Sequence, residues 1–168
     1  MDRVKGKVAI VTGSGSGLGR AEAVLFAKEG AKVAVTDIND ANGMETVEMI
    51  RAEGGEAEYW HLDASKEKEC ADVLAQVVEK FGKLDILVNN AGITGPDVPT
   101  EEVEEADWDR MFAINVKSVL FMTKHAIKYL RESGKGAIVN TSSLSGIVGD
   151  TELTPYHATK GTIVIMTQ

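Results

Sequence analysis

The sequence predicts an α/β fold in which helices cover both faces of a parallel β-sheet. Two observations point to this class. Short apolar runs rich in β-branched residues alternate along the chain with segments whose apolar residues recur at helical spacing. Short turns join them, and no linker, repeat or low-complexity tract intervenes. We therefore expect one domain, residues 1–168, which is long enough to bury a core.

The composition narrows the class of protein. Hydrophobic residues make up 43% of the chain, as in globular proteins, and the formal net charge is −8. This acidic balance argues against nucleic-acid binding, which needs a basic face. No apolar run reaches the length of a membrane span, and the N-terminus lacks the features of a signal peptide. We therefore expect a cytoplasmic protein without nucleic-acid or membrane partners.

Neither cysteine nor histidine points to a metal site. The single cysteine, Cys70, shares a helical apolar stripe with Val73, Leu74 and Val77, which predicts a core position. The three histidines have no cysteine or histidine neighbours at ligand spacing. We therefore predict that the protein binds no metal.

A glycine-rich turn joins the first predicted strand to the first helix. Residues 8–11 form an apolar run expected to be buried on both faces, and apolar residues at helical spacing follow at Leu18, Ala21, Val24, Leu25 and Ala27. Glycines keep side chains away from the backbone here, and free N–H groups of the helix start face the turn. This arrangement binds phosphate, although an ordinary tight turn carries similar glycines. The candidate ligand-binding residues are Gly13, Ser16, Gly17, Leu18 and Gly19.

The second predicted strand, 32–37, ends in an acidic residue. Asp37 lies roughly 20 residues past the glycine turn, where a nucleotide-binding βαβ unit places a carboxylate that accepts both ribose hydroxyls of NAD. The alternative role for Asp37 is a helix N-cap. Two other candidates for that role, Asn39 and Asp40, already precede the next helix.

Polar and small residues also follow the third and fourth predicted strands. Asp63 comes directly after the strand over 57–62. The fourth strand, 85–88, runs into Asn89–Gly92, whose small and amide side chains suit the close approach of a ligand.

One long helix is predicted after the fourth strand. Its apolar face carries Trp108, Met111, Phe112, Val119 and Met122. Asn115 falls on the same face as Trp108. A buried amide must be hydrogen-bonded, so Asn115 either braces the backbone or serves a site, and position alone favours neither role.

The fifth predicted strand, 137–140, leads to Ser143, and the last helix begins near Pro155. On that helix Tyr156 and Lys160 are one turn apart and share a face. A fixed ammonium favours the phenolate form of a nearby tyrosine, and a serine hydroxyl can hydrogen-bond a substrate oxygen. A solvated helix face would carry such a pair as well, but this pair follows a strand and so faces the ligand edge.

Right-handed crossovers predict a Rossmann-type doubly wound sheet with the strand order 3-2-1-4-5. The ligand should lie across the carboxyl ends of strands 1 and 4, where the winding reverses. Several candidate residues follow strands at this edge, which core packing alone does not explain. They are Gly13–Gly19, Asp37, Asp63, Asn89–Gly92 and Ser143.

As a set, these residues resemble the classical short-chain dehydrogenase/reductase family. The matching motifs are Thr12-Gly13-xxx-Gly17-x-Gly19, Asn89-Asn90-Ala91-Gly92, Asn115, Ser143 and Tyr156-xxx-Lys160, in this order and over essentially the whole chain. The resemblance implies that Tyr156 is the general acid/base, that Lys160 activates it and holds the nicotinamide ribose, and that Ser143 orients the substrate. It also implies that Asn115 positions a water in a proton relay.

The resemblance also implies a set of cofactor-binding residues. Asp63 would contact adenine, and Asn89 with Ala91 would line the adenosine and ribose path. The full implied set is Gly13, Ser16, Gly17, Leu18, Gly19, Asp37, Asp63, Ala64, Asn89, Ala91, Gly92, Tyr156 and Lys160.

The implied function is an NAD-dependent oxidoreductase that interconverts a secondary alcohol and a ketone. Its partners would be a small-molecule substrate and further copies of itself in a homo-oligomer. NAD is expected over NADP because Asp37 would repel the 2′-phosphate, and Ser14 and Ser16 stand where NADP-preferring relatives carry a cation. The segment 146–150 is similar to that of bacterial secondary-alcohol and cyclic-alcohol dehydrogenases.

The chain also departs from the family pattern. Family members continue past the Tyr-Lys helix into a sixth and a seventh strand, which the 168 residues lack. The fifth strand is therefore expected to be an exposed edge, and pairing through it or through the last helix is expected. The alternative function is a truncated nucleotide-binding domain that binds NAD(H) without significant turnover.

Overall fold

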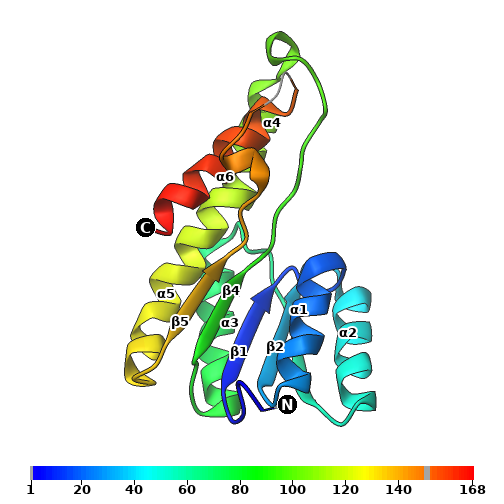
Figure 1. The fold of residues 1–168 in the computed structure, drawn as a ribbon, viewed down its shortest axis with the longest axis vertical. Coiled ribbons are helices and arrows are strands. Elements are labelled where there is room, and N and C mark those ends of the chain that lie inside the picture. The colour runs from blue at the N-terminus through cyan, green and yellow to red at the C-terminus, as the bar shows by residue number, and fades with distance from the viewer. Residues whose placement is uncertain (1, 150–151) are drawn as a thin grey trace.

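The computed structural model describes residues 2–149 and 152–168 (Figure 1). In this part of the chain, five parallel strands form one sheet in the order β3-β2-β1-β4-β5. The order confirms the predicted doubly wound sheet, whose winding reverses between β1 and β4. Asp150, which ends the segment compared with alcohol dehydrogenases, lies outside the described residues. The strands are β1 (Val8–Thr12), β2 (Lys32–Asp37), β3 (Glu56–His61), β4 (Ile86–Asn89) and β5 (Ala137–Asn140).

Helices cover both faces of the sheet. Helices α1 and α2 pack on one face and α3 and α5 on the other, whereas α4 and α6 rise beyond the C-terminal ends of the strands (Figure 1). No helix in the described residues is both long and apolar enough to cross a bilayer. The helices are α1 (Gly17–Lys28), α2 (Asp40–Ala52), α3 (Glu67–Phe81), α4 (Glu105–Phe112), α5 (Ser118–Glu132) and α6 (Thr154–Met166).

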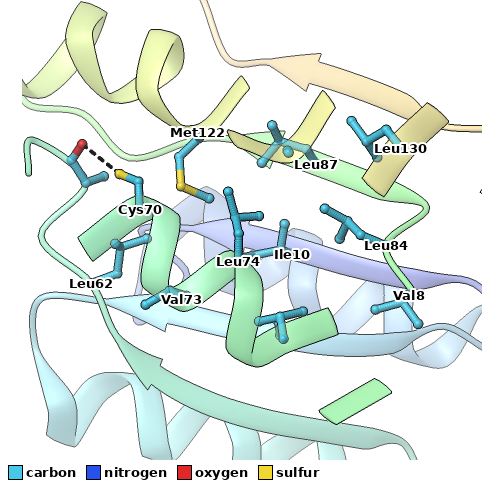
Figure 2. Packing of buried hydrophobic residues seen from close by; sticks show 14 residues of the cluster. Val8, Ile10, Leu62, Cys70, Val73, Leu74, Leu84, Leu87, Met122 and Leu130 are labelled. Atoms are coloured by element: carbon cyan, nitrogen blue, oxygen red, sulfur yellow. Dashed lines mark hydrogen bonds between the residues drawn. The ribbon is translucent and has the colours of Figure 1, made fainter. Parts of the chain in front are cut away.

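Alternate residues of β1 feed two separate cores. Val8 and Ile10 join the core beneath α3 and α5, whereas Ala9 and Val11 join the core beneath α1 and α2. Figure 2 shows the first core, in which side chains from α3, α5 and the strands pack against one another. Cys70 lies in this core and is completely buried, which confirms its predicted position.

The buried face of α1 differs from the predicted one. Leu18 and Leu25 are 57% and 51% exposed, and the buried residues of the helix are Gly19, Ala23 and Ala27. Small residues allow the helix to approach the sheet closely. The two leucines therefore lie on the outer side of α1, although their spacing placed them in the core.

The long helix predicted after β4 is two helices, α4 and α5, joined by a π-helical segment at Ala113–Lys117. Trp108 is 37% exposed and stacks on Phe112 with ring centroids 4.9 Å apart, whereas Asn115 is completely buried. The prediction of one apolar face shared by Trp108 and Asn115 is therefore wrong. Residues seven apart share a face only in an unbroken α-helix, and the wider π turn displaces the side chains that follow it.

Candidate cofactor and active site

The glycine turn between β1 and α1 is closely packed on one side and open on the other. Gly13 has a φ of 63°, and a Cβ there would lie 2.9 Å from the Cα of Ala91. A Cβ on Gly19 would overlap the carbonyl oxygen of Gly13 and the side-chain amide of Asn90. Gly17 has a φ of 53°, and no atom of the described residues lies within 4 Å of where its Cβ would be. The open side leaves space for a ligand against the free N–H groups of α1.

A cavity of about 510 Å³ lies over this turn at the C-terminal edge of the sheet. Most of the predicted cofactor-binding residues line it, namely Gly13, Ser16, Gly17, Leu18, Asp37, Asp63, Ala64, Ala91 and Gly92. The exposed Leu18 thus contributes to the cavity rather than to the core. The predicted residues that are not part of the lining are Gly19, Asn89, Tyr156 and Lys160.

Asp37 lies at the end of β2 with its carboxylate against the glycine turn. Its Oδ2 accepts a hydrogen bond from the backbone N–H of Gly15 at 2.8 Å, and its Oδ1 accepts one from the N–H of Asn39 at 2.9 Å. Each carboxylate oxygen can accept a second bond, so the group can still bind two ligand hydroxyls. The N-cap of α2 is Asn39, whose side chain accepts from the N–H of Asn42 at 3.0 Å. Capping therefore does not explain Asp37.

The loop after β3 is held in place from α3. Asp63 Oδ1 accepts hydrogen bonds from the N–H and the hydroxyl of Ser65, at 3.0 and 2.7 Å. The N–H of Asp63 donates to Glu69 at 2.9 Å, and the thiol of Cys70 donates to the carbonyl of Ala64 at 3.4 Å (Figure 2). Burial raises the pKa of the Cys70 thiol to about 12, so it stays protonated and keeps this bond.

Of the two asparagines at the end of β4, Asn90 and not Asn89 lines the cavity. Asn89 is buried, and its Nδ2 donates to Asn140 Oδ1 at 2.8 Å, toward β5. Asn90 Nδ2 donates to the carbonyls of Thr12 and Gly13 at 3.0 and 3.1 Å, which ties the end of β4 to the glycine turn. The side chains of Asn89 and Asn90 point in different directions because successive residues at a strand end face opposite sides.

Asn115 holds the loop after β4 to α6. Its Oδ1 accepts from the N–H of Ile93 and its Nδ2 donates to the carbonyl of Ile93, both at 2.8 Å. Nδ2 also donates to the hydroxyl of Thr159 at 3.1 Å, and that hydroxyl donates to the carbonyl of Tyr156 at 2.8 Å. Of the two roles open from the sequence, the structure shows bracing, between a loop of the cavity and the turn that carries Tyr156.

Of the remaining catalytic candidates, Lys160 lies beside Tyr156, whereas the hydroxyl of Ser143 accepts a hydrogen bond from the N–H of Ser145 at 3.2 Å. The Nζ of Lys160 donates to the carbonyl of Thr141 at 2.8 Å and lies 5.6 Å from the ring centroid of Tyr156. Lys160 is only 5% exposed, and this burial lowers the pKa of its ammonium group. The hydroxyl of Ser142 donates to the carbonyl of Lys160 at 2.9 Å, which holds the segment containing Ser143 against α6.

Gly92 connects these residues with the cavity. It lines the cavity, and a Cβ on it would lie 3.2 Å from Asn115 Oδ1 and 3.7 Å from Lys160 Nζ. The buried amide and the lysine ammonium therefore adjoin a residue of the cavity lining, although neither belongs to the lining itself.

Comparison with known proteins agrees with this geometry. The family model for short chain dehydrogenase matches residues 7–168. This chain belongs to the short chain dehydrogenase family. An uncharacterized oxidoreductase of Thermotoga maritima is 43% identical over 164 residues, which cover 98% of this chain and 64% of that protein. A cyclopentanol dehydrogenase of Comamonas sp. is 39% identical over 168 residues, which cover 100% of this chain and 67% of that protein.

A solved structure shows the same fold. NAD⁺-bound xylitol dehydrogenase superimposes with a TM-score of 0.96 at 32% identity, covering 99% of this chain and 64% of that chain. This short chain dehydrogenase therefore spans about two thirds of the length of the relatives that it matches.

Sequence reasoning missed several residues of the cavity. Ile93 directly follows the predicted segment Asn89–Gly92, so its neighbours could have indicated it. Arg110 and Ile114 come from α4 and the π-helical segment, and no local pattern marks them. In the described part of the chain, no group of three or more His, Cys, Asp or Glu side chains is placed to hold a metal ion. The missed lining residues are Ile38, Leu62, Ser65, Ile93, Arg110 and Ile114, and Asn90 was indicated only as part of the segment Asn89–Gly92.

Proposed function

We propose that this short chain dehydrogenase binds NAD(H) in the cavity and interconverts a secondary alcohol and a ketone. The observation that carries the proposal is the position of Gly92, which lines the cavity and adjoins both Asn115 and Lys160. One continuous site thus offers a nucleotide cradle and, at its end, a tyrosine beside a buried ammonium.

The cavity fits a dinucleotide at three places. The open side of Gly17 and the free N–H groups of α1 suit a pyrophosphate. Asp37 lies where its carboxylate can accept two ribose hydroxyls. Asp63 and Ala64 line the part of the cavity proposed for adenine, and their backbone is held by α3.

The chain's own residues supply the proton chemistry. When bound, the nicotinamide exchanges a hydride with the substrate carbon. Tyr156 donates or accepts the proton at the substrate oxygen, and the Lys160 ammonium stabilises the negative charge that develops on Tyr156. The Ser143 hydroxyl hydrogen-bonds the substrate oxygen and orients it. Asn115 connects the loop after β4 to the helical turn that carries Tyr156 and so keeps Tyr156 at a fixed position relative to that loop. Its Oδ1 can accept a further hydrogen bond from a relay water.

NAD is the proposed cofactor in preference to NADP. A 2′-phosphate at the ribose would meet the carboxylate of Asp37, and two negative groups placed side by side repel each other. Calorimetric titration with both cofactors tests this directly. We expect tighter binding of NAD, and Asp37→Ala should narrow the difference. Equal affinities in the unmodified chain would refute the assignment.

The proposed substrate is a small-molecule secondary alcohol or ketone. The 39% identity to a cyclopentanol dehydrogenase supports this class. A panel of cyclic and acyclic secondary alcohols, assayed with NAD, tests it. Tyr156→Phe should abolish turnover and leave NAD binding intact, because it removes the proton donor and little volume. Near-normal oxidation by that variant would refute the mechanism, and NAD binding without turnover by the unmodified chain would favour a binding domain.

We also propose that the 168-residue chain forms a homo-oligomer through β5. This strand is an edge of the sheet formed by the described residues, and its Val139 is 47% exposed. An edge strand presents unpaired N–H and C=O groups that can pair with a second copy.

A further inference from the structure

We propose that Thr46, supported by Arg20, positions Asp37 for ribose recognition and so helps to set the preference for NAD over NADP. This inference rests on the proposed function. It concerns side chains of α1 and α2 that are not part of the cavity lining. Thr46 and Arg20 are therefore positioning residues, which act on the cofactor through Asp37.

The connection passes through the peptide unit between Ser14 and Gly15. The N–H of this unit donates to Asp37 Oδ2 at 2.8 Å, and its carbonyl accepts from the Thr46 hydroxyl at 2.9 Å. The Thr46 hydroxyl also lies 3.1 Å from the carbonyl of Asn42, one helical turn earlier, so the two carbonyls share its single proton and the Ser14 carbonyl is the nearer of the two. Because a peptide unit is planar, fixing its carbonyl also fixes the direction of its N–H. Thr46, which is completely buried, therefore sets the direction from which the N–H meets the carboxylate.

Arg20 holds the same assembly from α1. Its Nε donates to Thr46 Oγ1 at 3.0 Å, which leaves the hydroxyl proton of Thr46 for a carbonyl acceptor. Its Nη2 donates to the carbonyl of Gly15 and forms an ion pair with Glu45 at 2.6 Å. Two carbonyls of the turn, those of Ser14 and Gly15, are thus held by residues outside the cavity lining.

Loss of this support should affect the two cofactors differently. NAD gains affinity from an Asp37 carboxylate that stays aligned with the ribose hydroxyls, whereas NADP is repelled by the same group. A misdirected carboxylate weakens NAD binding and relaxes the repulsion of NADP. The ratio of the two Kd values therefore reports on the positioning of Asp37, while a general loss of structure lowers both affinities together.

The test is calorimetric titration of the 168-residue chain with NAD and with NADP. Thr46→Val keeps the shape of the side chain but removes the hydroxyl, and we expect it to weaken NAD binding about tenfold with little change for NADP. Thr46→Ser keeps the hydroxyl and should restore the ratio. Thr162→Val is the matched control, because the Thr162 hydroxyl also donates to a carbonyl one helical turn earlier, that of Ala158 at 2.8 Å, and it should leave the ratio unchanged.

The Asp37→Ala background decides whether the effect passes through the carboxylate. There, adding Thr46→Val should change the ratio by less than about twofold, since the interaction being positioned is gone. An undiminished effect of Thr46→Val in that background, or an equal loss of both cofactors, would overturn the inference. If circular dichroism shows that Thr46→Val does not fold, Arg20→Lys replaces it, because lysine lacks the fork that reaches both Gly15 and Thr46.

The two proposals fail in different ways. If the unmodified chain binds neither cofactor, the proposed function is overturned and this inference with it. If the unmodified chain prefers NAD and Thr46→Val keeps the same ratio, only this inference is overturned.

Discussion

Replacing Asn115 by leucine tests how much of the site's stability rests on one buried amide. The substitution keeps the number of side-chain heavy atoms but removes three hydrogen bonds, two with Ile93 and one with Thr159. At about 1 kcal/mol net per bond, the expected loss in the free energy of unfolding is about 3 kcal/mol. In a domain of this size each 1 kcal/mol shifts Tm by about 2–4 °C, so Tm should fall by about 6–12 °C.

Thermal unfolding followed by circular dichroism gives the Tm, and a urea titration gives the free energy of unfolding. Asn39→Leu is a suitable comparison because it removes one exposed capping bond, to the N–H of Asn42, and should cost about 1 kcal/mol. An Asn115→Leu variant within about 1 kcal/mol of the unmodified chain would refute the bracing role, since three lost bonds should exceed one.

Three further outcomes are expected elsewhere in the molecule. Burial raises the pKa of the Asp85 carboxyl, but hydrogen bonds from the Val8 N–H and from two lysines outweigh burial and hold that pKa below its usual value. The ionised Asp85 carboxylate therefore stabilises the fold above its unfolded-state pKa, and this stabilisation is lost as the pH falls through its folded-state pKa. Asp85→Asn should reduce the loss of unfolding free energy that acidification causes, and an unchanged loss would contradict this reasoning. Gly17→Ala should weaken NAD binding about tenfold, because the added methyl group enters the open side of the turn and the residue has a positive φ that alanine adopts only with strain. An unaltered NAD affinity in calorimetry would exclude the turn as the binding site of the phosphates. Val139→Lys should shift sedimentation toward monomer, because a charge on β5 opposes strand pairing, and an unchanged oligomer would assign assembly to another surface.

The sequence by itself determined the sheet and the location of the site. Apolar runs and turn glycines report burial and backbone geometry locally, so the predicted strands over 32–37 and 137–140 match β2 and β5 at both ends. Because the strands are parallel, their C-terminal ends lie at one edge of the sheet. For this reason Asp37 and Asp63 line one cavity, although they lie on different strands.

Only the tertiary structure decided which side chains meet at that edge. Asn89 and Asn90 are equivalent in a motif, but pairing of β4 with β5 directs Asn89 to Asn140 and leaves Asn90 for the cavity. The support of the glycine turn by Thr46 and Arg20 likewise exists only once α1 and α2 pack side by side. Local periodicity indicates which positions of a helix or strand are buried. The direction of a polar side chain depends instead on hydrogen-bonding partners that are distant in the sequence, and only the packing of the elements brings those partners together.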